Sequence, residues 1–557
     1  MPLADVFAPY RLAPGALPEE AARAAEALAA EPLLAPPAEP LPAPLVNHAL
    51  ADLPTGRAAA AAEACRAADG APAGLSGPPR ACLSSPRQRA RVGEASRAAL
   101  EAGFAGVCLD RPDASLALGL LGAGFCVECQ RELGRRLERE YGDHFQPIDY
   151  LALARDALAA APGAVTFEQL PFGRDFWRFR NEALELAVRD YARAARDAGR
   201  TAARPFEVVA QFEALGPAQL RAARHLDAAI FTVAPPGPGT GLGLFRLLRA
   251  VMRRRPAAVA LAGGAPGPAL ARLAAVAATC GVELAGLEPA GEAGAEVASV
   301  RRLARQLSLR AGRPPAAAQP VAECAVLYSG EADLWTGGRH RQAVELAADA
   351  LAALHVQAPV VTRLQDVPAG AALVLADAGA LAPGEAKEIL RRLEAGAPVL
   401  AFGEPAATDE GGRPAGAFLP AGKFSGVRVG SGTLASLPSL AQGSRGAAPP
   451  DPAALEKALA ALLGKGRRAA GVTGRSKVLA VLQRTGEALD VHLVALGPER
   501  AQGSTLFLGL QVAGGVRRGR FISADGTDVR IPLNPSGYSI STVLPSFRGY
   551  AVLSLAA

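Results

Sequence analysis

The chain has 557 residues, a length that predicts two to four domains at about 150 residues each. Half of the residues are hydrophobic and 20% are charged, which is typical of a globular protein and excludes an intrinsically disordered one. The excess of 59 basic over 53 acidic residues is small and spread along the chain, so we expect no nucleic-acid partner. We expect no membrane span either, because no run of about 20 large apolar residues is present. The first residues lack the pattern of a signal peptide and the cysteines number seven, so we predict a cytoplasmic protein with reduced thiols.

Two stretches rich in proline and alanine predict the domain boundaries. Residues 311–320 read AGRPPAAAQP and residues 442–452 read QGSRGAAPPDP, and neither shows an apolar period. We therefore predict three domains, at 1–312, 320–442 and 453–557.

The first domain alternates short apolar runs with long helical patterns, which indicates parallel strands joined by helices. About 300 residues of this alternation predict an α/β fold of the (β/α)8 TIM-like barrel type. The predicted strands are 104–110, 206–212, 227–233, 257–261 and 282–287, and the clearest helices are 126–141 and 175–198.

The two later domains show different periods. Residues 320–442 repeat the strand–helix alternation on a smaller scale, which predicts an open, doubly wound sheet. Residues 453–557 contain short apolar runs separated by turns, which predict an antiparallel β-sandwich. Its clearest strands are 478–483, 489–495, 505–510, 529–533 and 551–555.

Several strings, taken in order, carry a resemblance to a known family. They are ACLSSPRQR (81–89), GFAGVCLDRPD (103–113), GFCVECQRELGRRLEREYGD (124–143), FWRFRNEALELAVRDYARAARDAG (176–199), VLYSGEADLW (326–335), LDVHLVAL (489–496) and YAVLSL (550–555). Together they resemble the hypothetical glycosyl hydrolases and family 42 β-galactosidase-like proteins. The resemblance implies a barrel, a flavodoxin-like trimerisation domain and a terminal β-domain. It also implies hydrolysis of a glycosidic bond in an oligosaccharide, and a homo-oligomer, either a dimer or a trimer.

Candidate catalytic carboxylates come from the ends of predicted barrel strands, where barrel enzymes place reacting groups. Asp110 ends one strand, and Glu213 and Glu288 directly follow two others. Glycosidases commonly use two carboxyl groups, one as acid and one as nucleophile or base. The alternative is structural, because a strand-end carboxylate can cap a helix or pair with an arginine such as Arg111. If the site is catalytic, Arg111 becomes a candidate substrate-binding residue.

The chain also departs from the family pattern. Relatives of family 42 usually carry an Asn-Glu acid/base pair at a strand end, whereas the Asn-Glu of this chain, Asn181-Glu182, falls inside a predicted helix. Two readings therefore stay open: a glycosidase with a different carboxylate layout, and an inactive carbohydrate-binding or assembly protein on the same scaffold.

Two tryptophans are candidates for stacking against a sugar. Trp177 follows the predicted loop around residues 171–173, and Trp335 opens the second domain. The alternative for each is a place in the apolar core, which is the commoner position of a large aromatic side chain.

The cysteines give a candidate metal site. Cys126 and Cys129 have a CxxC spacing, and Cys82 and Cys108 lie on neighbouring predicted strands and could complete the four ligands that structural zinc requires. Against this, buried free cysteines are ordinary small core residues. We expect no other cofactor, and a thiol- or metal-dependent enzyme at Cys126 and Cys129 remains a third reading.

A glycine-rich run, Gly237-Pro-Gly-Thr-Gly-Leu-Gly243, follows a predicted strand and precedes a helix. This position suits a phosphate cradle, but the spacing fails the dinucleotide fingerprint. We therefore predict a loop at the rim of the barrel.

Overall fold

The structure is a computed structural model of the chain. The residues that it describes are 50–53, 64–69, 71–73, 80–116, 122–142, 145–160, 169–203, 205–235, 239–253, 255–262, 267–285, 291–310, 318–405, 427–440, 448–464, 468–485, 488–497, 499–514 and 516–555.

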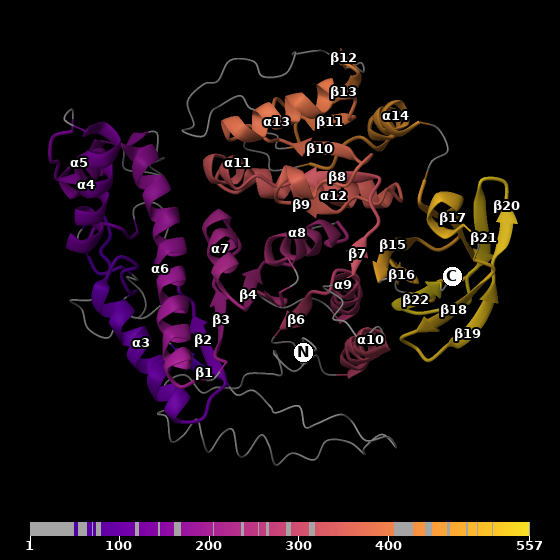
Figure 1. The fold of residues 1–557 in the computed structure, drawn as a ribbon, viewed down its shortest axis with the longest axis horizontal. Coiled ribbons are helices and arrows are strands. Elements are labelled where there is room, and N and C mark those ends of the chain that lie inside the picture. Colours follow the sequence, from indigo (N-terminus) through magenta and orange to yellow (C-terminus); the bar gives the residue numbers. More distant parts are fainter. Residues whose placement is uncertain are drawn as a thin grey trace. The chain divides into compact units, whose positions relative to one another are not determined.

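The chain divides into two compact units, and the boundary between them along the chain lies between residues 233 and 234. In the first unit, strands β1 to β4 form parallel pairs in chain order, with β1 beside β2, β2 beside β3 and β3 beside β4 (Figure 1). The strands are β1 (Leu50–Leu53), β2 (Gly106–Asp110), β3 (Glu207–Phe212) and β4 (Ala228–Val233). The helices are α3 (Pro86–Glu101), α4 (Val127–Tyr141), α5 (Tyr150–Ala160), α6 (Gly173–Thr201) and α7 (Pro217–Ala222), followed by the 3-10 turn η5 (Ala223–His225).

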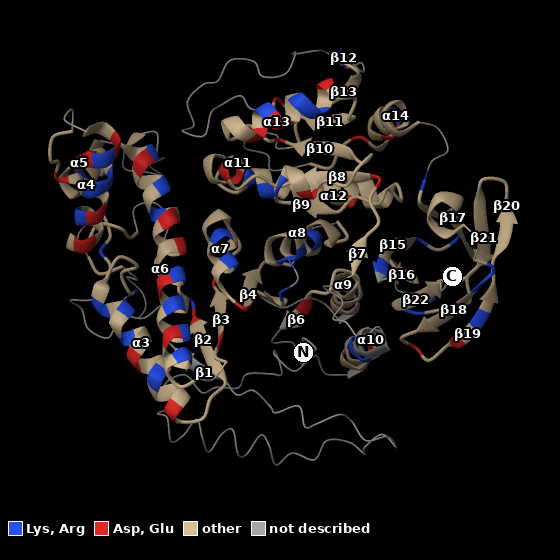
Figure 2. Ribbon diagram, in the orientation of Figure 1, with Lys and Arg blue, Asp and Glu red and all other residues tan. Residues whose placement is uncertain are grey.

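Helix α6 shows why this part of the sequence forms a long helix. Its buried residues Phe176, Leu184 and Tyr191 recur at helical spacing on one face. Acidic and basic residues occur along the whole length of the helix, as Figure 2 shows. Some of them form ion pairs with neighbouring helices, such as Asp190 with Arg89 of α3 at 2.9 Å.

The second unit begins with a short parallel pair and three helices. Strand β5 pairs with β6, and the helices around them are largely apolar on their buried faces. The elements are α8 (Leu242–Met252), β5 (Ala257–Leu261), α9 (Gly267–Thr279), β6 (Glu283–Ala285) and α10 (Gly291–Arg310).

A six-stranded sheet follows, with strand order β12-β13-β11-β10-β8-β9. Its pairs are parallel except for the antiparallel edge pair of β12 and β13. The strands are β8 (Cys324–Leu327), β9 (Val360–Val361), β10 (Ala372–Ala376), β11 (Val399–Phe402), β12 (Val427–Val429) and β13 (Gly432–Leu437). The helices are α11 (Gly330–Trp335), α12 (Arg339–Ala353), α13 (Pro383–Glu394) and α14 (Pro452–Leu463), with the 3-10 turn η7 (Leu364–Asp366).

The C-terminal part consists of two antiparallel sheets, ordered β14-β17-β21-β20 and β19-β18-β22-β16-β15-β7. Alternate residues of β16, such as Val491 and Leu493, enter a core shared with Leu506, Phe521 and Leu553. The elements are β7 (Gln319–Pro320), β14 (Ala470–Gly474), β15 (Val478–Thr485), β16 (Ala488–Ala495), β17 (Ser504–Gly509), α15 (Leu510–Ala513), β18 (Arg518–Ser523), β19 (Asp528–Pro532), β20 (Asn534–Ser536), β21 (Ser539–Val543) and β22 (Tyr550–Leu555).

The structure confirms a mixed α/β protein with parallel sheets followed by antiparallel ones. The predicted linkers at 311–320 and 442–452 lie largely outside the described residues. None of the helices in the described ranges is both long and apolar enough to cross a membrane.

Candidate functional site

Two of the predicted carboxylates lie at the same edge of the first unit's sheet. Asp110 is the last residue of β2, and Glu213 directly follows β3. The two strands are parallel neighbours, and Asp110 pairs in register with Gln211. The third candidate, Glu288, lies outside the described residues.

Arg111 connects the two carboxylates. Its Nε and Nη2 donate to the two oxygens of Asp110 at 3.0 and 3.2 Å, and its Nη1 donates to Oε1 of Glu213 at 3.5 Å. Arg80 donates to the same Glu213 oxygen at 3.3 Å. The four side chains are partly exposed. A ligand at this edge therefore meets a mixed cluster of two carboxylates and two guanidiniums.

The backbone at Arg111 is strained. Its φ is +47°, in the left-handed region that non-glycine residues seldom adopt. Its backbone N–H donates to the carbonyl of Gln211 at 2.8 Å, which holds the turn against β3. Strain of this kind persists only where the surroundings enforce it, and it concentrates at functional sites.

Asp113 supports the same edge and was not among the predicted site residues. It is fully buried, and its carboxylate accepts hydrogen bonds from the backbone N–H groups of Glu213 and Ala214 and from Nε2 of Gln219 at 2.9, 3.3 and 2.8 Å. Burial raises the pKa of Asp113 to about 6, although these hydrogen bonds favour the charged form. Asp113 thus fixes the loop that carries Glu213, without itself facing solvent.

The two candidate tryptophans are half-buried. Trp177 lies in the first turns of α6, where its carbonyl accepts a hydrogen bond from the Asn181 side chain at 2.9 Å. Trp335 ends α11 in the second unit. As predicted, Asn181 and Glu182 lie inside a helix, where Glu182 pairs with Arg136 and Arg178 at 2.5 and 2.9 Å.

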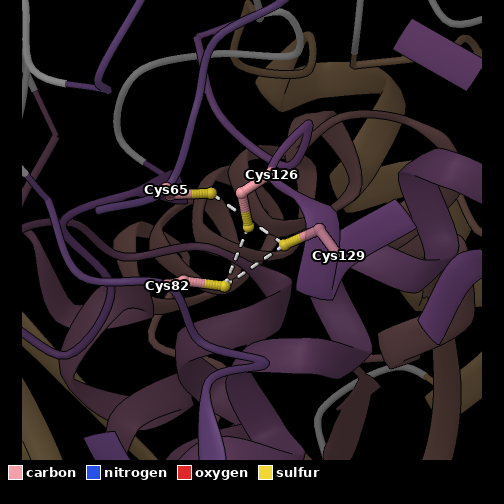
Figure 3. A group of neighbouring side chains, drawn as sticks. All are labelled: Cys65, Cys82, Cys126 and Cys129. Carbon is pink, nitrogen blue, oxygen red and sulfur yellow. Dashed lines mark hydrogen bonds between the residues drawn. The ribbon is translucent and has the colours of Figure 1, made fainter. Parts of the chain in front are cut away.

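Four cysteine sulfurs form a compact group in the first unit, which we call the cysteine cluster (Figure 3). The Sγ atoms of Cys65, Cys82, Cys126 and Cys129 all lie within 4.8 Å of one another, and all four residues are buried. The structure thus brings together three of the predicted ligands. Cys65 completes the group in place of Cys108, which is a buried residue inside β2, paired in register with Val209.

The cysteine cluster fits a tetrahedral zinc ion. Zinc–sulfur bonds of about 2.3 Å place the sulfurs of a tetrahedron about 3.8 Å apart. Three of the sulfur pairs, Cys65–Cys129, Cys82–Cys129 and Cys82–Cys126, are separated by 3.9, 3.5 and 3.2 Å. Four soft donors with no carboxylate among them suit zinc in a structural role.

The four sulfurs of the cysteine cluster differ in acidity. Hydrogen bonds from the other three thiols and from the backbone N–H of Gly124 at 3.1 Å hold the pKa of Cys65 well below its usual range. The pKa of Cys126 is also lowered, mainly by its hydrogen bond with Cys129, whereas the hydrogen bonds with Cys126 and burial raise the pKa of Cys82 and of Cys129. Arg180, which is buried, donates to the carbonyl of Ser115 at 3.0 Å, in the loop that follows β2.

The described part of the glycine-rich run is not a phosphate cradle. The carboxylate of Asp349, on α12, accepts hydrogen bonds from the Thr240 hydroxyl and from the N–H groups of Gly241 and Gly243 at 2.8, 3.1 and 2.9 Å. A Cβ at Gly243 would lie 2.2 Å from the carbonyl oxygen of Glu345. The amides at the start of α8 are thus used to join α8 to α12.

No protein-family model and no curated protein matches the sequence. Solved structures do match over most of the chain. A β-galactosidase from Bacillus circulans sp. alkalophilus matches with a TM-score of 0.61 and 13% identity, over 90% of this chain and 88% of that chain. A catalytic mutant of a GH42 β-galactosidase from G. stearothermophilus matches with a TM-score of 0.60 and 12% identity, over 91% and 88%. An α-L-fucosidase from Paenibacillus thiaminolyticus matches with a TM-score of 0.54 and 14% identity, over 89% and 84%. The chain therefore has a fold similar to that of family 42 β-galactosidases and related glycoside hydrolases.

Proposed function

We propose that the protein is a glycoside hydrolase that cleaves a glycosidic bond in an oligosaccharide. The observation that carries the proposal is the pair of carboxylates, Asp110 and Glu213, at the ends of adjacent parallel strands and connected by Arg111. Glycoside hydrolysis requires two carboxyl groups beside one bond. The fold similarity to β-galactosidases makes a galactoside the first substrate to test.

The contacts suggest distinct roles for the site residues. Asp110, held by two hydrogen bonds from one guanidinium, suits a nucleophile or base better than a general acid, which has to carry a proton. Glu213 and Glu288 are the remaining candidates for the acid. Arg111 would bind sugar hydroxyls beside the carboxylates, and Trp177 and Trp335 would provide apolar surfaces for stacking.

The wider architecture belongs to the same proposal. Residues 1–312 form a TIM-like barrel, 320–442 a flavodoxin-like domain that mediates assembly into a dimer or trimer, and 453–557 a β-sandwich. The cysteine cluster holds a zinc ion that joins the loops around residues 65, 82 and 126 and takes no part in the reaction. We place the protein in the cytoplasm, where its thiols stay reduced.

The test is sugar release from a panel of aryl glycosides and oligosaccharides, beginning with galactosides. We expect release by the wild type and a loss of at least about a hundredfold in Asp110→Asn and in Glu213→Gln, because each removes a reacting group. Asp190→Asn is the matched control, since Asp190 is a partly exposed, arginine-paired carboxylate on α6, away from the strand ends. A fully active Asp110→Asn enzyme would refute the assignment of Asp110.

One observation favours a second candidate function, a catalytically inactive carbohydrate-binding or assembly protein. Asp110 forms an ion pair with Arg111, and Glu213 forms ion pairs with Arg80 and Arg111. A protein of this kind releases no sugar from any substrate of the panel, yet binds an oligosaccharide in a titration, and loses that binding in Arg111→Gln.

A further inference from the structure

A basic cavity in the second unit lies apart from the residues discussed so far. It has a volume of about 370 Å³ and is lined by residues of α8, the end of α9, the segment around β7, the segment from β9 into η7, and β15. Pockets that hold small ligands begin at about 300 Å³. The cavity is therefore large enough for a small metabolite.

Helix α8 supplies the charge of the cavity. Arg246 and Arg249 are three residues apart and so lie on one face of the helix, Arg253 directly follows its last residue, and all three line the cavity. Arg363, from η7's N-terminal side, is the fourth lining arginine, and Asp366 is the lining carboxylate. Asp366 is already paired with Arg363 at 2.7 Å, which leaves the α8 arginines in excess.

The two inner arginines are held by neutral partners. Arg246 is 8% exposed and donates to the carbonyl of Ala358 at 2.9 Å. Arg249 donates to the carbonyls of Cys280 and Ala318. Within the described ranges neither guanidinium forms an ion pair with a carboxylate, although buried charges in proteins are normally paired.

Burial makes these two charges costly. It lowers the pKa of both Arg246 and Arg249, because the charged form loses contact with water. The fixed hydrogen bonds to carbonyls also orient the guanidiniums without neutralising them. The carboxylate of Asp349 acts on Arg246 in the opposite sense to burial without forming an ion pair with it. An anion in the cavity would give both arginines a directly bound partner.

The remaining lining residues are mixed. Aliphatic side chains such as Ala250, Val321 and Val361 line the cavity together with polar ones such as Gln319 and Gln483. Arg253 and Arg363 are exposed and lie where a ligand can reach them from solvent. A bound molecule would thus meet guanidiniums and also aliphatic side chains against which an organic part can pack.

We propose that this cavity binds a phosphate group, carried by free phosphate or by a small phosphate ester whose organic part packs on the aliphatic side chains. Guanidinium groups bind phosphate through charge-assisted, often bidentate hydrogen bonds. The site lies wholly within the second unit, and the proposal does not depend on the glycosidase activity.

The experiment is isothermal titration calorimetry of the full-length protein with inorganic phosphate, with glucose 6-phosphate and with glucose. We expect saturable binding of both phosphate compounds, weakened by added salt because charges carry it, and no binding of glucose. Tighter binding of glucose 6-phosphate than of inorganic phosphate identifies an ester as the ligand, and equal affinity identifies free phosphate.

Variants separate the site from nonspecific attraction to a basic protein. We expect Arg253→Gln to weaken binding of glucose 6-phosphate about tenfold, the effect of losing one good charge-assisted contact. The matched control is Arg302→Gln, since Arg302 is an exposed arginine of α10 that does not line the cavity. Arg249→Gln also removes two structural hydrogen bonds, so the folding of this variant is checked by circular dichroism. If Arg249→Gln does not fold, the binding of Arg253→Gln alone tests the site.

The proposal is overturned by either of two results. One is the absence of saturable heat with both phosphate compounds at millimolar concentration and low salt. The other is equal affinity in the wild type, Arg253→Gln and Arg302→Gln, which would show that the bound phosphate lies elsewhere.

Discussion

The cysteine cluster region and the two C-terminal antiparallel sheets are stabilised in opposite ways. In these sheets, long antiparallel pairs such as β15 and β16 run through eight residue positions, and alternate side chains enter one apolar core. Around the cysteine cluster, the described residues of 64–69, 71–73 and 80–81 pair through isolated bridges, Ala64 with Ala81 and Arg66 with Pro72. The loops share an apolar core cluster of 15 buried residues that contains the four cysteines together with Phe125 and Phe176.

The difference shows what each kind of region needs. A sheet satisfies its backbone hydrogen bonds internally and gains stability from buried apolar area, so it needs no further cross-link. Irregular loops have few such bonds, and the proposed zinc ion would join them at four points at once. The C-terminal sheets should therefore respond to core substitutions, and the cluster region to loss of metal or sulfur.

The largest expected effect is that of Cys129→Ala. It removes one of the four sulfurs, and zinc binding contributes about 10–16 kcal/mol of free energy in small zinc-dependent domains, so we expect a loss of about 5 kcal/mol or more. The measurements are zinc content by mass spectrometry and thermal unfolding. Cys108→Ala is the control, because it removes a buried thiol outside the cluster and should keep one zinc per chain.

An apo protein that unfolds at the same temperature as the zinc-loaded one would contradict this prediction. So would a wild-type protein purified from zinc-containing medium that holds no metal.

Phe521→Ala tests the C-terminal sheets by the same measurements. Phe521 is fully buried and packs edge-on against Phe547, with ring centroids 5.8 Å apart. We expect its truncation to cost about 3–5 kcal/mol through lost burial and a cavity. Chemical denaturation measures the cost, and zinc content should stay unchanged. A drop in bound zinc in this variant would show that the two regions do not hold their chains independently.

Asp113 gives an intermediate effect that depends on pH. Its pKa of about 6 in the folded protein exceeds the ordinary value of 3.8, so the folded state binds its proton more tightly than the unfolded state. Stability from this group is therefore lost as the pH rises through 6, by about 1.4 kcal/mol between pH 5 and pH 7.5. Unfolding of wild type and Asp113→Asn at both pH values measures the difference. A wild type that gains stability relative to the variant over this range would reverse the sign and refute it.

The smallest effect on stability is expected for Arg520→Gln in β18 of the C-terminal sheets. Arg520 and Asp528 form an exposed ion pair at 2.7 Å between β18 and β19, and exposed pairs contribute little because water and salt screen them. We expect no measurable shift in melting temperature. A clear shift in melting temperature would mean that surface ion pairs, in addition to the apolar core, stabilise the C-terminal sheets.

Sequence patterns located these regions unequally. The short apolar run at 489–495 predicted a strand that the structure has at β16, because a run of this length between turn signals is a local pattern. Asp110 and Glu213 could be placed at strand ends for the same local reason. That Arg111 joins them could be anticipated only in part, since its neighbour Asp110 is adjacent in sequence but Glu213 is not.

Features that depend on loop geometry were missed. Cys65 has no partner at a metal-binding spacing, and it reaches the cluster only because the loop at 65–73 folds back on itself. Asp113 stands three residues after Asp110 and reads as an ordinary turn residue, yet its hydrogen bonds go to residues about 100 positions away. The contact of the glycine-rich run with Asp349 was also not foreseen, because the two are about 100 positions apart in sequence.

The contact between α8 and α12 determines how the second unit can be cut into fragments. An expression fragment that begins at residue 320 keeps Asp349 but loses Thr240, Gly241 and Gly243, the groups that donate to its carboxylate. It also exposes the surface of α12 at Glu345 against which Gly243 fits with no room for a side chain. A fragment that begins at residue 239 keeps both sides of this joint. Domain dissection should therefore start before α8, even though the proline-rich sequence at 311–320 predicts a boundary there.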